Sequence, residues 1–434
     1  MRVLKVGRRK ILVFHFNIPI MKAVIIGGGV IGLCSAYYLQ KTGWQVTVLD
    51  DSRGDEGCSY GNLGMIVPSH FVPLSSPGAI AKGVRWLFDS RSPFYIKFSF
   101  DPRLISWALR FVRNATRQNV EKAAIPLVEF NLYSQSLFEE LNAEPGLDFG
   151  LEHTGILMYY KSQKAADEEM HLARKAGELG IDVEILNKDE VQRLEPQTEL
   201  DVLGAAHYRC DAHLDPNRFM VQLRKCLQVS GVDVQSNTSV TQIIASSGRI
   251  QKVITSKGEQ EGDAYVLACG AWLGQLAKRL GLKIPLIAGK GYSFTYERPL
   301  KKLNFPAILC EARVAISPMC ERMRYGGTME VGSPDNKINM NRVKGIVESI
   351  SQYLPDFNLN VPDTNDIWYG LRPCSPDGLP YVGRSSKFEN LLIAGGHCMM
   401  GMSLGPATGK SIADLANNKK THVDIRAFEP SRFS

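Results

Sequence analysis

The sequence predicts an α/β protein in which a parallel sheet with flanking helices is combined with a second unit of β-sheet and helices. Residues 22–50 read as a β-branched strand, a glycine-rich turn, an apolar helix and a second strand. Further continuous apolar runs, at 262–270 and 391–396, are typical of strands that a parallel sheet buries on both faces. Amphipathic helical stretches and strand-like runs between these segments predict the second unit.

Length and composition describe an ordinary globular chain. Its 434 residues suffice for two or three domains or for one large α/β protein, and 44% of them are hydrophobic. No run of 18 apolar residues occurs, so we expect no transmembrane helix. The nine cysteines form no C-x-x-C pair and no metal-ligand spacing. This pattern favours reduced thiols, a cytoplasmic location and no metal site.

The net charge of +7 is concentrated at the N-terminus. Residues 1–20 carry five basic residues and no acid, which leaves +2 for the rest of the chain. No basic stripe with interleaved aromatics follows, so a nucleic-acid partner is not predicted. The apolar stretch before Met21 is interrupted by His15, Asn17 and Pro19 and has no small-residue cleavage site. We interpret residues 1–20 as a non-essential extension, with Met21 as an alternative start.

Three glycines follow the first strand in the spacing G-x-G-x-x-G. Gly27 allows a tight turn, Gly29 lets a diphosphate approach the backbone, and Gly32 lets the next helix pack closely on the strand. The helix is predicted from about Val30 to Lys41. This arrangement predicts a Rossmann-like dinucleotide-binding unit, with a purely structural glycine turn as the alternative.

The start of this helix is the expected diphosphate site. The N–H groups of Val30 and Ile31 and the positive end of the helix dipole favour an anion there. Asp50 ends the second strand, where a carboxylate accepts hydrogen bonds from ribose hydroxyls. An acid here disfavours a 2′-phosphate and therefore NADP, although Arg53 weakens that argument. The unit alone does not separate FAD from NAD.

A later segment, 239–270, resembles the second flavin fingerprint of two-domain FAD oxidoreductases. Short paired strands begin near Val240, and an apolar strand then ends at Gly270 with Trp272 beyond it. We expect this strand to return to the nucleotide-binding sheet beneath the dinucleotide. An ordinary buried strand and turn is the alternative.

The segment 389–415 resembles a C-terminal flavin-binding strand and helix. An apolar strand and a glycine-rich turn precede an amphipathic helix that starts at about Leu404. We expect the N–H groups of Gly401, Met402 and Ser403 to face the pyrimidine edge of the flavin, where they stabilise negative charge. An NAD dehydrogenase has no such element, so these segments together favour FAD.

Six sequence motifs resemble the DAO family, which contains D-amino-acid dehydrogenases, glycine oxidases and sarcosine oxidases. They are VIIGGGVIGLCSAYYL at 24–39, CSYGNLGMIVP at 58–68, DAHLDPNRF at 211–219, PLIAGKGYS at 285–293, YGLRPCSPDGLPYVG at 369–383 and GGHCMMGMS at 395–403. The resemblance spans residues 21–415 and is closest to the D-amino-acid dehydrogenase branch. It implies an FAD-binding domain interleaved with a β-sheet substrate domain.

Composition places the boundaries of this interleaving. The FAD-binding domain is predicted at 21–75, 205–285 and 368–434. The substrate domain is predicted at 76–204 and 286–367. Within them we expect helices at 121–144, 164–180, 215–231 and 341–354 and strands at 291–297 and 321–331.

Oxidation of an α-amino acid requires a group that holds the substrate carboxylate, and Arg372 is the candidate. Glycine oxidase-like proteins use the arginine of the corresponding G-L-R-P motif in this way, although a structural salt bridge is the alternative. His397 is a candidate for tuning the flavin or accepting the amine proton, because histidine titrates near neutrality. Tyr292 and Tyr325 are candidates for lining the pocket, with core packing as the alternative.

The resemblance also implies how the flavin is held. Ser59, Asn62 and Gly64, in the loop after the second strand, are expected to contact its ribityl chain or isoalloxazine. In sarcosine oxidases a cysteine before the T-P-D element is covalently linked to the flavin, and Gly370 stands at that place here. We therefore expect non-covalent FAD.

Three neighbouring polar residues, Asp211, His213 and Asp215, have the residue types of metal ligands. They directly precede Pro216 and a predicted helix. We interpret them as helix caps rather than as a metal site.

The resemblance implies oxidative deamination of a D-amino acid, or of a cyclic imino acid, with hydride transfer from the α carbon to flavin N5. A quinone or another acceptor then takes the electrons. The mixed aromatic and basic segment 83–113 is compatible with peripheral membrane contact at the inner face or with a wall of the substrate domain. An oxygen-using glycine or sarcosine oxidase and a non-catalytic flavin-binding protein are the rival functions.

Overall fold

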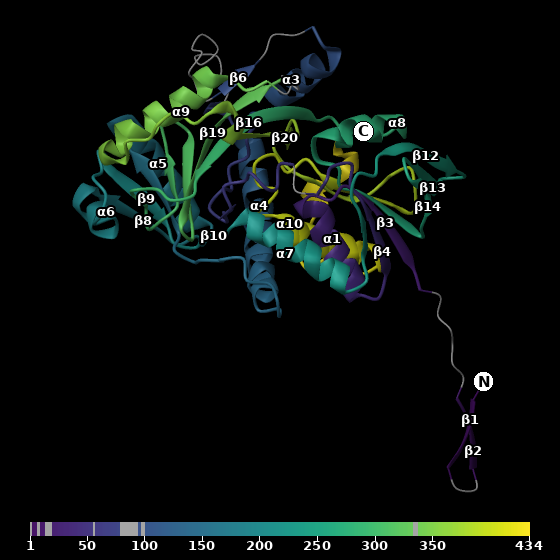
Figure 1. Cartoon of the computed structure of the whole chain (residues 1–434). Helices are drawn as coiled ribbons and strands as arrows, with labels where there is room; N and C mark the ends of the chain where they lie inside the picture. The colour runs from purple at the N-terminus through teal and green to yellow at the C-terminus, as the bar shows by residue number, and fades with distance from the viewer. Residues whose placement is uncertain are drawn as a thin grey trace.

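The computed structural model describes residues 2–6, 9–13, 20–54, 57–78, 94–96, 100–332 and 337–434. Within these residues the strands form two main sheets, a six-stranded, mostly parallel sheet, called the parallel sheet below, and a nine-stranded mixed sheet. The two sheets lie side by side, with helices packed around them (Figure 1). Arg2–Val6 (β1) and Arg9–Val13 (β2) form an antiparallel hairpin that lies apart from the rest of the chain.

The parallel sheet has the strand order β11-β4-β3-β15-β22-β21. Its strands are β3 (Lys22–Ile26), β4 (Gln45–Leu49), β11 (Asp233–Gln235), β15 (Ala264–Leu267), β21 (Tyr381–Arg384) and β22 (Leu391–Gly395). All neighbours pair in parallel except β21, which is antiparallel to β22. The central strands β15 and β22 are buried along their whole length, as their apolar sequences predict. The predicted α/β class is confirmed.

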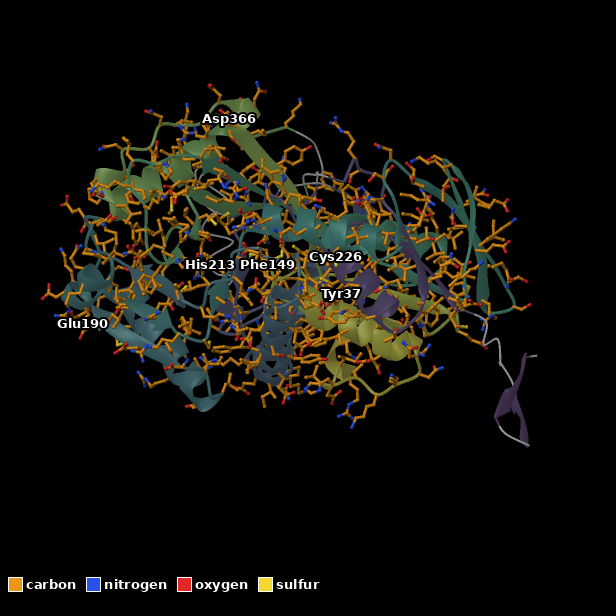
Figure 2. All side chains as sticks on the ribbon, turned by 60° about the horizontal axis from the view of Figure 1, so that its bottom comes forward. Tyr37, Phe149, Glu190, His213, Cys226 and Asp366 are labelled. Atoms are coloured by element: carbon orange, nitrogen blue, oxygen red, sulfur yellow. The ribbon has the colours of Figure 1, made fainter. Side chains whose placement is uncertain are left out.

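The helices lie between and around the sheets. They are α1 (Val30–Lys41), α3 (Pro102–Asn114), α4 (Arg117–Asn142), α5 (Gln163–Glu178), α6 (Lys188–Leu194), α7 (Pro216–Val229), α8 (Leu273–Arg279), α9 (Met340–Tyr353) and α10 (Gly405–Ala416). Helices α1 and α10 are in close backbone contact, because a Cβ at Gly409 would lie 2.4 Å from the carbonyl carbon of Cys34. Helix α7 packs beside α1, and Figure 2 shows Tyr37 and Cys226 of these two helices near each other.

The mixed sheet has the strand order β20-β16-β19-β18-β17-β7-β9-β8, with β6 paired to β19. Its strands are β6 (Phe94–Ile96), β7 (Ile156–Tyr160), β8 (Val183–Asn187), β9 (Gly204–Tyr208), β16 (Ile287–Tyr296), β17 (Ala307–Leu309), β18 (Val314–Met319), β19 (Arg322–Val331) and β20 (Ile367–Cys374). Helix α9 covers one face of it through an apolar cluster that includes Val343, Ile346 and Ile350. We call that face outer, and the face toward the parallel sheet inner.

The remaining elements are short. Strands β12 (Val240–Ser246), β13 (Arg249–Thr255) and β14 (Gly258–Glu261) form a meander, and β5 (Met65–Ile66) pairs with β10 (Ala212–His213). The 3-10 turns are η1 (Gly270–Trp272), η2 (Pro355–Phe357), η3 (Thr364–Asp366), η4 (Arg426–Phe428) and η5 (Pro430–Phe433). No helix in the described part of the chain is long and apolar enough to cross a bilayer.

The sequence located most of these elements. The helices predicted at 121–144, 164–180 and 341–354 are present as α4, α5 and α9, within a few residues at each end. Strands β9 and β20 pair in the mixed sheet, although residues 205–208 and 368–374 were assigned to the FAD-binding domain. The division into domains remains a proposal. Because β9 and β20 pair with strands of the mixed sheet, we place both segments in the proposed substrate domain.

Candidate functional site

Close contacts leave no room for a side chain at three positions of the glycine turn after β3, with backbone at Gly27 and Gly32 and with the Asp50 side chain at Gly28. Gly27 has φ +116°, and a Cβ there would lie 2.3 Å from the carbonyl oxygen of Ala268 on the neighbouring strand. A Cβ at Gly32 would lie 1.8 Å from the carbonyl oxygen of Gly27. A Cβ at Gly28 would lie 2.3 Å from Oδ2 of Asp50. These three glycines are therefore required by the fold itself.

Gly29 is different, because the protein leaves space beside it. An added Cβ would meet only the Ser59 hydroxyl oxygen, at an ordinary contact distance of 3.4 Å. In the described part of the chain, the N–H groups of Gly29 and Ile31 make no hydrogen bond, and the N–H of Val30 donates to Ser59 Oγ at 3.0 Å. An open space lined by amide donors at a helix N-terminus fits a diphosphate.

Asp50 lies at the end of β4 beside this turn. Its Oδ1 accepts hydrogen bonds from the N–H and hydroxyl of Ser52, at 3.2 and 3.0 Å. Its Oδ2 accepts from Arg224 of α7 at 3.0 Å, and both side chains are only 13% exposed. Arg224 also donates to the carbonyl of Gly28. Arg224 was not predicted from the sequence, because 174 positions separate it from Asp50 and only the tertiary fold brings α7 to the turn.

The loop 57–64 lies between the N-terminus of α1 and the mixed sheet. Asn62 accepts the N–H of Gly64 through its side-chain oxygen at 2.7 Å, which closes a tight turn. Gly64 has φ +71°, and a Cβ there would lie 1.9 Å from the carbonyl oxygen of Leu214. Ser59 lies at the open space beside Gly29, which we call the diphosphate space, whereas Asn62 and Gly64 shape the loop. A flavin contact of the latter two remains a proposal.

The turn before α10 presents unpaired amides. Hydrogen bonds within the described chain involve neither the N–H of Gly401 nor those of Met402 and Ser403. Met402 and Ser403 are buried, and the Ser403 hydroxyl donates to Asn131 and accepts from the N–H of Val67. Buried N–H groups are almost always paired in native proteins, so this turn fits a ligand with acceptor atoms. A contact of these N–H groups with the flavin edge remains a proposal.

The other expected cofactor contacts lie around the same end of the parallel sheet. Val240 begins β12, close to where the N–H of Thr238 donates to the carbonyl of Asp50 at 2.8 Å. Gly270 has φ +53° and starts η1, directly after β15. Trp272 is 58% exposed, which places most of its ring on the surface. The role of these three residues remains a proposal.

Arg372 lies on the inner face of β20. Its Nη1 donates to the carbonyl of Thr328 at 2.7 Å, and a Cβ at Gly291 would lie 2.0 Å from the same nitrogen. The guanidinium therefore lies flat on the backbone of β16. In the described part of the chain it has no carboxylate partner. Its remaining donors fit a carboxylate ligand, and among the described residues Arg372 makes no structural salt bridge.

His397 lies beside the turn formed by residues 401–403, and its burial changes its expected titration. Burial lowers the pKa of His397 to about 3, so the ring is neutral near pH 7. This lowered pKa disfavours the expected titration near neutrality, and a role of His397 in accepting the amine proton stays a prediction. Its Nε2 lies 2.9 Å from the hydroxyl of Thr408, and its buried Nδ1 has no partner within the described residues. A hydrogen bond from Nδ1 to the flavin remains a proposal.

Tyr292 and Tyr325 do not line a pocket on the inner face. Both are buried on the outer face with Phe294, in the cluster that packs under α9. The Tyr292 hydroxyl donates to Glu330 at 3.0 Å and accepts from the N–H of Asn339, the residue that caps α9. The prediction failed because strand alternation sets the face of each side chain, and sequence alone did not say which face meets the cofactor.

The polar residues before α7 are only partly caps. Asp215 caps the helix and accepts from the N–H groups of Asn217 and Arg218, as predicted. Asp211 instead binds Ser69, whose N–H and hydroxyl donate to it at 3.0 and 2.5 Å. His213 lies on β10, where burial lowers its pKa to about 4. The cap interpretation is therefore wrong for these last two residues. Among the described residues no cluster suited to a metal ion occurs.

Comparison with known proteins agrees with this geometry. A family model described as DAO, FAD dependent oxidoreductase, matches residues 22–415. D-amino acid dehydrogenase 1 of Mesorhizobium japonicum is 30% identical over 424 residues, which cover 95% of this chain and 100% of that protein. D-amino acid dehydrogenase of Bradyrhizobium diazoefficiens is 31% identical over 427 residues, which cover 95% and 99%.

Solved structures share the fold. Glycine oxidase from Geobacillus kaustophilus superposes with a TM-score of 0.76 at 23% identity, covering 95% of this chain and all of that one. L-proline dehydrogenase from P. horikoshii gives a TM-score of 0.74 at 19% identity, covering 95% and 98%.

Proposed function

This chain belongs to the DAO family of FAD-dependent oxidoreductases, and we propose that it is a dehydrogenase that oxidises the C–N bond of a D-amino acid. The observation that carries the proposal is Arg372, an inner-face guanidinium with no carboxylate partner among the described residues. The D-amino acid dehydrogenases to which the chain is similar over 95% of its length support the substrate class. FAD, when bound, supplies the acceptor for the hydride of the substrate α carbon.

The protein contributes position and electrostatics. Arg372 holds the substrate carboxylate and so limits the orientations that the α carbon can take toward the cofactor. The free N–H groups of Gly401, Met402 and Ser403 stabilise negative charge that develops at their edge of the site. The N–H groups of Gly29 and Ile31, which have no partner among the described residues, would hold the diphosphate.

Burial lowers the pKa of His397 to about 3, which disfavours this side chain as the base that takes the amine proton. We infer that the substrate reacts with its amine in the neutral form. The ammonium group of the substrate loses its proton before or during binding. On this view kcat/KM rises about tenfold per pH unit below the amine pKa and then levels. A bell-shaped profile with a limb near neutrality would instead indicate a titrating protein base.

The test of function is an anaerobic mixing experiment with the purified yellow protein. A panel of D-amino acids, their L-enantiomers, D-proline, glycine and sarcosine is added, and bleaching of the visible flavin band is recorded. Bleaching by D-amino acids without bleaching by the L-enantiomers supports the proposal. Bleaching by glycine or sarcosine alone, with peroxide formed in air, would establish the rival oxidase function.

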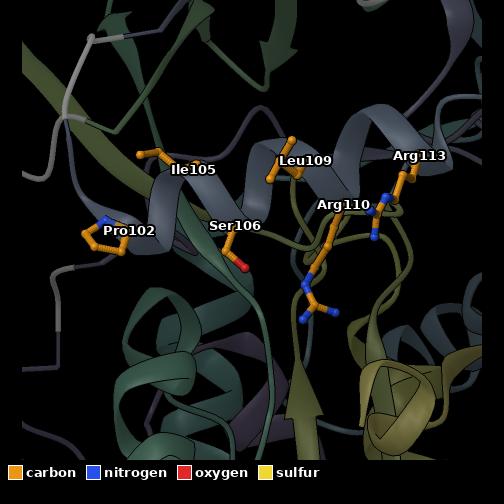
Figure 3. Close-up of a pocket in the computed structure, with 6 residues that line it drawn as sticks. All are labelled: Pro102, Ile105, Ser106, Leu109, Arg110 and Arg113. Carbon is orange, nitrogen blue, oxygen red and sulfur yellow. The ribbon is translucent and has the colours of Figure 1, made fainter.

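We further propose that electrons pass to a quinone in a membrane that α3 contacts. The surface of α3 exposes Ile105, Leu109 and Val112, at 46%, 59% and 56%. Figure 3 shows Arg110 and Arg113 on the same helix, with their guanidinium groups reaching to the side away from Leu109. Apolar side chains flanked by cations suit an anionic lipid surface. Residues 83–93 and 97–99 of the segment considered above lie outside the described residues.

Sedimentation with vesicles tests the membrane contact. The protein is expected to bind vesicles that contain phosphatidylglycerol, and Leu109→Glu is expected to weaken binding without changing reduction of a soluble dye. Equal binding of Leu109→Glu and the native chain would assign the contact elsewhere.

A further inference from the structure

The loop 58–63 is held on the mixed sheet by hydrogen bonds to four of its six carbonyl groups. Ser293 of β16 donates to the carbonyl of Gly61 at 2.8 Å, and Ser317 of β18 donates to that of Leu63 at 2.6 Å. Arg324 of β19 donates to two more carbonyls, at residues 60 and 62, at 2.8 and 2.7 Å. Four consecutive carbonyls are therefore held by three side chains of the inner face.

Arg324 is the centre of this arrangement. It is only 4% exposed, and its Nε donates to the hydroxyl of Thr295 at 2.9 Å. Within the described residues no carboxylate bonds to it, because the nearby Asp215 pairs with Arg322. Burial lowers the pKa of Arg324 to about 10, so the guanidinium stays charged near pH 7. A buried charge needs polar partners, and here the loop carbonyls provide them.

The same loop contacts both the start of α1, where the diphosphate is expected, and the strand that carries Arg372. At one end Ser59 Oγ accepts the N–H of Val30 at the start of α1. Next to it the thiol of Cys58 donates to the carbonyl of Leu371 at 2.9 Å, one residue before Arg372. A shift of the loop would therefore change the distance between the diphosphate space and the substrate-anchoring arginine.

We propose that Arg324, assisted by Ser293 and Ser317, is a positioning residue that sets the loop 58–63 between the cofactor and the substrate clamp. The proposal rests on the FAD-dependent function stated above. Arg324 acts through the loop and does not itself contact the substrate. Its loss is expected to impair both retention of FAD and the alignment of the reacting groups.

The experiment compares Arg324→Met with Arg324→Lys and with a matched control, Arg342→Met. Arg342 is equally buried, at 2% exposed, but lies on α9 over the outer face and pairs with Glu330. Release of FAD from each holoenzyme is followed by its fluorescence on dilution, together with the flavin visible spectrum, kcat and KM. These first two readouts need no substrate, so they remain informative if the substrate class is wrong.

Arg324→Met is expected to raise the dissociation constant of FAD at least about tenfold, to alter the flavin band and to lower kcat more than it raises KM. Arg324→Lys should recover part of the loss, because an ammonium still reaches a carbonyl. Arg342→Met should lower the melting temperature while FAD affinity stays within about twofold. Equal FAD affinity in all three variants, or equal weakening in both methionine variants, would overturn the proposal.

A second pair of variants covers the case in which Arg324→Met does not fold. Ser293→Ala and Ser317→Ala each remove one hydrogen bond to the loop and leave the arginine in place. Each is expected to weaken FAD retention by about threefold to tenfold. Unchanged FAD retention and an unchanged spectrum in both serine variants would also refute the role of the loop contacts.

Discussion

Gly29→Ala separates the part of the glycine turn that serves the fold from the part that serves the cofactor. Gly29 has φ −75° and ψ −178°, an extended conformation that alanine adopts freely. The new methyl group would meet only Ser59 Oγ at 3.4 Å. The protein without cofactor should therefore keep its stability, with a change within about 0.5 kcal/mol or a gain of up to about 1 kcal/mol from reduced unfolded-state entropy.

The effect on FAD should be much larger. The methyl group fills the space in which a phosphate oxygen approaches the N–H groups at the start of α1. Losing two hydrogen bonds to a charged group costs about 1.5–3 kcal/mol each, or roughly 3–6 kcal/mol together. This corresponds to an increase of about 10² to 10⁴ in the dissociation constant of FAD.

The assay is a fluorescence titration with FAD beside thermal unfolding of the cofactor-free protein. Gly177→Ala is the matched control, because Gly177 lies in α5 with open space around its Cβ position. It should raise stability by about 0.5–1 kcal/mol and leave FAD affinity unchanged. Gly32→Ala should instead disrupt folding, since its Cβ would lie 1.8 Å from a backbone oxygen. A Gly29→Ala protein that binds FAD as tightly as the native chain would refute the assignment of this space to the diphosphate.

Three other outcomes are expected. Arg372→Ala should raise KM by at least about 100-fold, because a bidentate charged pair is lost, while FAD stays bound; unchanged kinetics would remove the clamp assignment. Burial raises the pKa of Asp211 to about 7 from 3.8, so the folded state binds its proton more tightly than the unfolded state. Relative to Asp211→Asn, the native chain should lose stability as pH rises from about 4 to above 7, by up to about 4 kcal/mol in urea unfolding; parallel pH profiles would contradict this. Acid precipitation should release all flavin into the supernatant, since Gly370 offers no thiol, and a yellow pellet would show a covalent link.

The sequence by itself determined the elements whose signal is local. The glycine spacing at residues 27–32, the apolar strand before it and the acid at position 50 specify a nucleotide-binding unit, because close backbone approach and helix dipoles depend on neighbours in the chain. The start of α7 was predictable for the same reason, since Asp215 bonds to N–H groups two and three positions later.

Only the tertiary structure decided which side chains meet across distance. Tyr292 and Tyr325 point to α9 rather than to the inner face, because a one-residue change in register reverses the face of every side chain on a strand. The sequence contains Arg324 and Arg224, but nothing local shows that one binds the loop carbonyls and the other binds Asp50. Burial likewise decided the direction in which the pKa of His397 shifts, since desolvation depends on packing from all sides and not on neighbouring residues in the chain.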